Sequence, residues 1–339
     1  MPVKAIALLS GGLDSALAVR LVQEQGVEVE GVHFISVFTV GVGERPGLLP
    51  ALRVARELGV GVQVINFNRE HCELVASPPH GYGSNMNPCI DCHIAMLRRA
   101  AERMAEVGAR FILTGEVLGQ RPMSQRRDTL ALIDREAGLV GMVLRPLSAR
   151  LLPPTVPERE GWVDRERLLD IRGRSRKVQL SLSERYGLKA HSSPAGGCLL
   201  TDPGFSARLR DLLEASPGRK LDLWDVHLLK VGRHFRLDEA TKAIVGRRER
   251  ENAVIETFSR PEDLLLTTRD TPGPTTLLRG RQGERNIRLA ASLTARYSRL
   301  RREPSVAVAI RPGRKGPTEK EQVVEVAPAA EPPEGCQRL

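Results

Sequence analysis

The sequence has few cysteines, few aromatic residues and no long apolar run. Its longest uncharged apolar stretch, Gly31 to Gly43, holds 13 residues, whereas a membrane-spanning helix requires about 20. We therefore expect no transmembrane segment and no membrane partner. Lys4 precedes an apolar run that Asp14 interrupts, and no small-residue cleavage site follows. A secretory signal is not expected, and the cytoplasm is the expected location.

The five cysteines, an odd number, argue against a disulfide framework and favour thiol chemistry or metal binding. With 2 Trp, 3 Tyr and 7 Phe in the chain, phosphate and shape recognition of nucleic acid is favoured over base stacking. The contents of charged residues (27%), Gly (31) and Pro (23) are ordinary for a globular protein. The length of 339 residues predicts about two domains.

Positive charge is concentrated in the second half of the chain. Residues 1–150 carry 16 basic and 15 acidic groups, whereas residues 151–339 carry 35 and 26, within a formal net charge of +10. This asymmetry indicates a polyanionic partner such as nucleic acid, although basic surfaces also serve solubility alone.

The first half alternates β-rich runs with helical patterns, which predicts an α/β, doubly wound parallel sheet with a ligand crevice where the strand order reverses. The expected strands are residues 4–9, 27–35, 60–67 and 111–114, and the expected helices are 15–24, 50–58 and 89–107. Further helical patterns at 164–171 and 174–186 complete a first domain, 1–200.

A second, smaller, basic α+β domain is expected over residues 201–310. Helices are predicted at 205–215 and 285–301. The remaining stretch, 311–339, is crowded with Pro, Gly, Lys and Glu and is expected to be a disordered tail. Cys336 lies there and is the cysteine least expected to matter.

A buried strand runs through two glycines into a helix in the segment Ser10-Gly11-Gly12-Leu13-Asp14-Ser15. Adjacent glycines let a ligand approach the backbone, and the free N–H groups of the following helix form an anion site. The hydroxyls of Ser10 and Ser15 add donors, and Asp14 is placed to hold Mg²⁺. The alternative is a tight turn without a ligand. No Walker A string is present, so γ-phosphate transfer is not supported.

Two cysteines lie at a predicted helix start, where Asn87 is expected to cap and Pro88 to occupy the first helical position. The helix dipole would lower the thiol pKa of Cys89, and Cys92 shares its face. Cys198 follows Gly196-Gly197 in a loop that can bring a third thiol to the crevice.

Several interpretations of the three cysteines remain open. Cys-x-x-Cys-His formally matches c-type haem attachment, but that chemistry requires export. The others are inert buried thiols, a zinc site with His93 as fourth ligand, a three-thiolate iron–sulfur cluster with one iron free for exogenous sulfur, or a persulfide with a resolving cysteine.

These motifs together resemble the tRNA thiolation branch of the PP-loop ATP pyrophosphatases, which contains the 4-thiouridine and 2-thiouridine synthetases. The segments Thr114–Gln125 and Leu144–Leu147 are similar to strand-end segments of 4-thiouridine synthetases. The resemblance covers residues 1 to about 202. Residues 201–310 resemble small RNA-binding domains of ribosome quality-control factors. Their basic clusters contain Lys230, Arg233, His234, Arg236, Arg247, Arg248, Arg250, Arg279, Arg281, Arg285 and Arg288.

The resemblance implies that Ser10, Gly11, Gly12, Asp14 and Ser15 bind pyrophosphate and Mg²⁺, and that Gly115 lies beside the adenosine of ATP. It also implies that Cys89, Cys92 and Cys198 ligate a 4Fe-4S cluster.

The implied activity is that of an ATP-dependent tRNA uridine thiolase, a sulfurtransferase that forms AMP and pyrophosphate. Adenylation activates a uridine carbonyl oxygen, and sulfur from the cluster, or from a persulfide on Cys198 or Cys92, replaces it. The implied partners are tRNA, a sulfur donor (a cysteine desulfurase or sulfide) and a second copy of the chain. The alternatives are a PP-loop reaction on a small molecule and a non-catalytic RNA-binding adaptor.

Overall fold

The structure, a computed structural model, describes residues 2–39, 50–190, 197–314, 322–329 and 336–339. They form two compact units, Met1–Thr201 and Asp202–Leu339. None of the helices in these ranges has the length and apolar character needed to cross a membrane.

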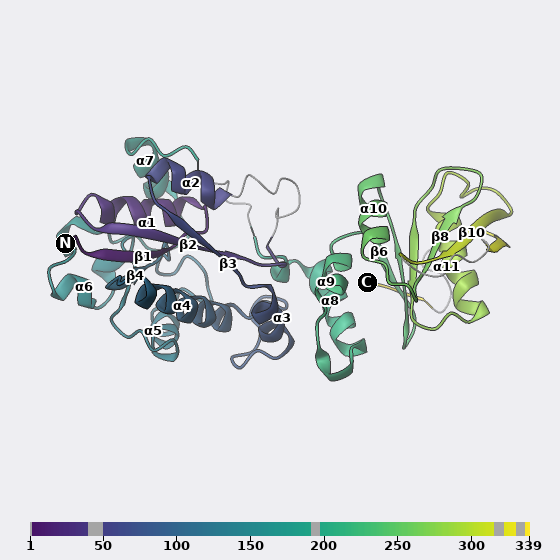
Figure 1. Cartoon of the computed structure of the whole chain (residues 1–339), viewed down its shortest axis with the longest axis horizontal. Helices are drawn as coiled ribbons and strands as arrows, with labels where there is room; N and C mark the ends of the chain where they lie inside the picture. Colours follow the sequence, from purple (N-terminus) through teal and green to yellow (C-terminus); the bar gives the residue numbers. More distant parts are fainter. Residues whose placement is uncertain (1, 40–49, 191–196, 315–321, 330–335) are drawn as a thin grey trace. The chain divides into compact units, whose positions relative to one another are not determined.

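The first unit is built on a five-stranded parallel sheet in the order β3-β2-β1-β4-β5 (Figure 1). Its strands are β1 (Lys4–Leu8), β2 (Glu28–Ile35), β3 (Val62–Asn66), β4 (Phe111–Leu113) and β5 (Val143–Leu144). The doubly wound parallel sheet is confirmed. The strand order reverses between β1 and β4, so the loops after these two strands are the expected ligand-binding loops.

Helices cover both faces of this sheet (Figure 1). The helices are α1 (Leu13–Gln23), α2 (Pro50–Leu58), α3 (Asn68–Ala76), α4 (Cys89–Glu106), α5 (Arg127–Glu136), α6 (Val156–Arg159) and α7 (Lys177–Arg185). Side chains of β1 alternate between two cores: Ala5 and Ala7 pack with α1 and α2, and Ile6 packs with α4 and α5.

Two local predictions in this unit are wrong. The helix expected at 164–171 is a single 3₁₀ turn, η2 (Arg165–Arg167), because the chain becomes extended at Leu168, whose side chain is buried in the core. Helix α4 begins at Cys89 with Pro88 as its N-cap. Asn87 instead closes a turn in which its carbonyl accepts from the Gly83 N–H at 2.9 Å.

The second unit contains a seven-stranded antiparallel sheet in the order β11-β10-β8-β9-β7-β6-β12. Its strands are β6 (Arg233–Asp238), β7 (Thr241–Val245), β8 (Leu264–Thr268), β9 (Thr276–Arg279), β10 (Val306–Pro312), β11 (Gln322–Val326) and β12 (Gln337–Arg338). The expected α+β class of this second domain is confirmed.

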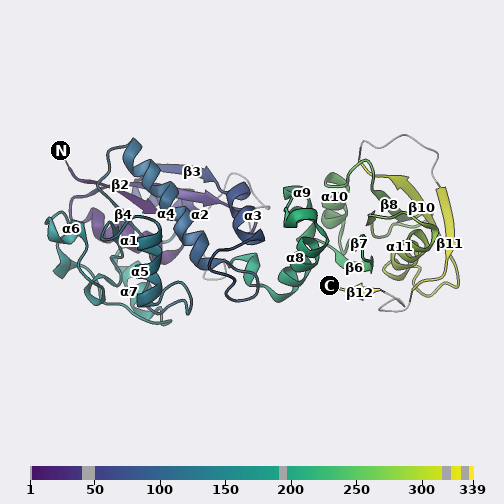
Figure 2. The ribbon, with the colours of Figure 1, turned by 90° about the horizontal axis from the view of Figure 1, so that it is seen from below.

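Four helices accompany this sheet, namely α8 (Pro203–Ala215), α9 (Leu223–Leu229), α10 (Glu249–Thr257) and α11 (Glu284–Arg296). Helix α11 covers one face, where Ala290 packs with Phe235 and Leu266. Helices α9 and α10 lie on the other side, where Ile255 packs with Leu277 (Figure 2).

The expectation of a disordered tail is wrong for part of residues 311–339. β11 pairs with β10 along five residues, from Gln322 to Val326, and β12 pairs with β6. Backbone pairing at both sheet edges orders these segments despite their polar composition. Residues 315–321 and 330–335 lie outside the described ranges.

Candidate nucleotide and thiol site

The loop between β1 and α1 presents hydroxyls and backbone donors at one point. Gly11 has φ +80°, and a Cβ there would lie 2.4 Å from the Ala51 nitrogen. Gly12 is the N-cap of α1 and has no side chain to cap it. Ser15 donates to the Gly12 carbonyl at 2.9 Å, and its Oγ lies 3.2 Å from Oγ of Ser10. The first turn of α1 therefore combines backbone N–H groups with two hydroxyls, which suits a phosphate.

The loop after β4 meets this first turn backbone to backbone. A Cβ on Gly115 would lie 2.4 Å from the Ser15 nitrogen and 2.6 Å from the Asp14 carbonyl carbon. Glycine is therefore required at 115 for the approach itself, because any side chain would separate the loop from α1.

Asp14 is held at one oxygen and unpartnered at the other. Its Oδ2 accepts from Nε2 of Gln120 at 3.1 Å and lies 3.5 Å from the guanidinium of Arg176. Its Oδ1 is buried without a hydrogen-bond partner. A buried carboxylate oxygen of this kind fits a divalent cation. The contact of Arg176 with Asp14 was not predicted from the sequence, because Arg176 lies in a segment without a motif.

The three candidate thiols are close enough for their charges to affect one another's pKa. Cys89 and Cys92 lie in the first turn of α4, whereas an isolated bridge to Thr39 holds Cys198 just beyond the end of β2. Burial raises the pKa of the Cys92 thiol, and the charges of Cys198 and Cys89 raise it further. Burial likewise raises the pKa of Cys198, to about 11.

Cys89 differs because it is paired with a cation. Burial would raise the pKa of its thiol, but a hydrogen bond with His93 and the charge of that imidazolium lower the pKa to about 7. Burial would lower the pKa of His93, yet Cys89 and Glu116 raise it to about 10. Nδ1 of His93 lies 2.8 Å from Oε1 of Glu116. This pairing with the His93 imidazolium therefore lowers the pKa of the Cys89 thiol.

Glu116 extends the chain of contacts into the core. Its Oε2 accepts from Nε of Arg145 at 2.9 Å and from the Thr114 hydroxyl at 3.0 Å. Arg145 in turn makes two 2.8 Å hydrogen bonds to Asp134. Burial would raise the pKa of Glu116, but Arg145 and His93 hold it at about 2.

Glu116→Gln should lower stability, and the loss should depend on pH. The folded-state pKa of Glu116 is about 2 against an ordinary 4.5, so its contribution is present above pH 4.5 and is lost as the pH falls toward 2. We expect the difference in unfolding free energy between wild type and variant to shrink by about 2 kcal/mol from pH 6 to pH 3, measured by urea denaturation.

The matched control for this experiment is Glu102→Gln, which removes an exposed carboxylate paired with Arg99 at 2.8 Å. Its difference from wild type should be small and flat with pH. If the stability difference between wild type and Glu116→Gln also did not change with pH, the lowered pKa of Glu116 would be contradicted.

In the part of the chain that the structure describes, no three His, Cys, Asp or Glu side chains are grouped closely enough to hold a single metal ion. His93, the suggested fourth ligand of a zinc site, is engaged with Cys89 and Glu116.

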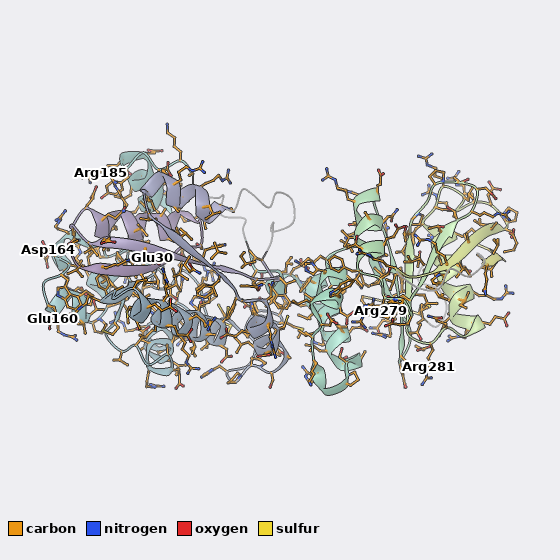
Figure 3. All side chains as sticks on the ribbon, viewed as in Figure 1. Glu30, Glu160, Asp164, Arg185, Arg279 and Arg281 are labelled. Atoms are coloured by element: carbon orange, nitrogen blue, oxygen red, sulfur yellow. The ribbon has the colours of Figure 1, made fainter. Side chains whose placement is uncertain are left out.

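Several basic residues suggested for RNA contact are internal. Arg236 makes two 2.8 Å hydrogen bonds to Asp211. Arg279 donates to Oδ1 of Asp263 at 2.9 Å, inside the second unit (Figure 3). His234 is fully buried, and burial lowers its pKa well below the usual value. These three side chains stabilise the second unit and are not part of an exposed RNA surface.

Each of the two units contains a segment that matches a known protein family. Residues 2–150 match the family model "Thiamine biosynthesis protein (ThiI)", and residues 232–333 match "NFACT protein RNA binding domain". The chain is 29% identical over 176 residues to the tRNA-specific 2-thiouridylase MnmA of Pelotomaculum thermopropionicum, covering 44% of this chain and 46% of the relative.

Two further matches cover a similar share of the chain. A probable tRNA sulfurtransferase of Thermotoga maritima is 33% identical over 150 residues, covering 43% of this chain and 36% of that protein. A solved structure of a 4-thiouridine synthetase–RNA complex with bound ATP has 31% identity and a TM-score of 0.35, covering 43% of this chain and 37% of that one. The chain spans less than half the length of these relatives. The N-terminal unit is therefore similar to the PP-loop domains of tRNA-thiolating proteins.

Proposed function

We propose that this protein is an ATP-dependent tRNA sulfurtransferase that adenylates a uridine carbonyl oxygen and replaces it with sulfur. AMP leaves with the uridine oxygen, pyrophosphate is the second product, and the sulfur comes from a cysteine desulfurase or from sulfide. The match of residues 232–333 to an RNA-binding domain supports tRNA as the partner.

One observation carries the proposal. Two consecutive residues, Gly115 and Glu116, join the phosphate loop to the thiols: Gly115 packs on Ser15, and Glu116 pairs with His93, which hydrogen-bonds Cys89. The uridine carbon activated at this loop would therefore lie at the same end of the strands as the sulfur chemistry.

Each group at the phosphate loop has a defined part in this proposal. The N–H groups at the start of α1 and the hydroxyls of Ser10 and Ser15 bind the pyrophosphate portion of ATP. Asp14 would hold Mg²⁺ through its unpartnered Oδ1, while Gln120 fixes the other oxygen. Positioning and charge stabilisation are the contributions of these side chains.

The donor set at the thiols fits an iron–sulfur cluster. The charges of Cys89 and Cys198 raise the pKa of Cys92, and the charge of Cys89 raises that of Cys198, so the three thiols lie within electrostatic reach of one another. A 4Fe-4S cluster held by three thiolates leaves one iron for an exogenous sulfur. The chain itself would supply the three thiolates and the imidazolium of His93 beside Cys89.

The direct test is deletion of the gene followed by mass spectrometry of bulk tRNA nucleosides. We expect 4-thiouridine or 2-thiouridine to fall to background and the wild-type gene to restore it. Unchanged levels of both nucleosides would contradict the proposal.

Pyrophosphate release by the purified protein separates the proposal from its rivals. Thiolation requires that tRNA stimulate the release of pyrophosphate from ATP. An ATP turnover rate that does not change when RNA is added would favour a reaction on a small molecule. Binding of tRNA without release of pyrophosphate would favour a non-catalytic adaptor.

A further inference from the structure

A cavity of about 1020 Å³ in the second unit has a wall dominated by guanidinium groups. Six arginines line it, from β6, the start of α10 and the turn after α11: Arg233, Arg247, Arg248, Arg299, Arg301 and Arg302. Glu249 is the one carboxylate in its lining. The cavity therefore carries a large excess of positive charge.

Few of these charges are neutralised within the described part of the chain. Arg247 pairs with Glu251 at 3.1 Å, and Arg233 stacks on the ring of Tyr297 at 4.3 Å. The other four arginines form no ion pair with a carboxylate among the described residues. Arg299, Arg301 and Arg302 are exposed. Like charges gathered in this way repel one another, so the arrangement is favourable when an anion is bound.

The backbone at the start of α10 adds to the positive electrostatic potential of the cavity. Arg248 is the N-cap of α10 and Glu249 its first residue, and both line the cavity. The N–H groups of this first turn, with the positive end of the helix dipole, border the same space as the guanidiniums. Guanidiniums and a helix N-terminus are the two protein groups that bind phosphate most readily.

We propose that this cavity is where the second unit grips successive phosphates of an RNA backbone. The inference rests on the proposed function and makes it specific, because it assigns RNA contact to one cavity instead of the whole basic surface. Its volume lies at the upper end of pockets that enclose a small molecule. Six cations exceed what one phosphate requires, so several consecutive phosphodiesters are the fitting ligand.

The test compares two triple variants with the same loss of charge in the full-length protein. Arg299→Gln, Arg301→Gln and Arg302→Gln together remove three cavity arginines. The control, Arg281→Gln, Arg285→Gln and Arg288→Gln, removes three exposed arginines of the same unit that are not in the cavity lining. Binding of a fluorescent unmodified tRNA transcript is measured by anisotropy over a range of NaCl concentrations.

We expect the cavity variant to bind tRNA on the order of 100-fold more weakly at 0.15 M salt, with a salt slope smaller by about 2 to 3. The control variant should stay within a few-fold of wild type. ATP affinity and the thermal midpoint should match wild type in both variants, which shows that each is folded.

Equal weakening by the two triple variants, or a larger loss in the control, would overturn the cavity assignment. Such a result would leave the thiolation proposal standing, because wild-type tRNA binding and the nucleoside assay test it separately. A wild-type protein that binds no tRNA would overturn both.

Discussion

Gly115→Ala should strongly weaken nucleotide binding at the phosphate loop. The added Cβ would lie 2.4 Å from the Ser15 nitrogen and 2.6 Å from two further backbone atoms of α1. None of these atoms can rotate away, so the first turn of α1 or the loop after β4 must shift. A displacement of about 1 Å in a positioning group can cost about 100-fold. We therefore expect Mg-ATP affinity, measured by calorimetry, to fall at least about 100-fold.

Gly61→Ala is the matched control for this variant. Gly61 lies in the same unit, and a Cβ there would meet no atom within 4 Å. It should bind Mg-ATP like wild type and unfold at a similar temperature. Wild-type affinity in Gly115→Ala would mean that the nucleotide does not use the junction of these two loops, and the proposed site would fail.

The first unit was largely predictable because its signals are local. Buried parallel strands appear as short apolar runs, and the Gly11-Gly12 pair marks the point where a strand passes directly into a helix. The strand order then places the loops after β1 and β4 together. The Gly115 contact with Ser15 follows from that topology.

Contacts between distant segments were not predictable. Arg176 reaches Asp14 only because the segment before α7 packs beside the phosphate loop. Likewise, nothing local to Arg236 and Arg279 shows that Asp211 and Asp263 will neutralise them. A basic cluster in a sequence therefore did not distinguish an internal ion pair from an exposed cation, whereas the folded chain does.

Ordering of the last strands also depended on tertiary context. Gln322–Val326 is a short segment in a polar tail, and its exposed residues give it little apolar area to bury. The free edge of β10 supplies the backbone hydrogen bonds that its own sequence cannot predict.

Each of the variants Cys89→Ala, Cys92→Ala and Cys198→Ala should lower the rate of tRNA thiolation by at least about 1000-fold. When catalytic groups act as a unit, loss of one removes the contribution of all. Mg-ATP affinity should be unchanged, since the thiols do not line the turn between β1 and α1. Cys336→Ala is the control: this cysteine packs against the core of the second unit and should be dispensable. Thiolated nucleoside formed per enzyme on a tRNA transcript is the measurement.

The pattern among the three variants decides between the two sulfur chemistries. A cluster needs all three thiolates, so each alanine variant should lose iron and its visible absorption band together with activity. A persulfide route in iron-free protein needs two cysteines: one carries the persulfide whose outer sulfur attacks the activated carbon, and the other breaks the resulting S–S bond by forming a disulfide with the first. The thiol pKa near 7 at Cys89, against about 11 at Cys198, favours Cys89 as the persulfide carrier, in place of the Cys198 or Cys92 expected from the sequence. Loss of activity in Cys89→Ala and in one other variant, with the third variant active and the wild type free of iron, would therefore indicate persulfide chemistry. Full activity in all three variants would remove the thiols from the mechanism.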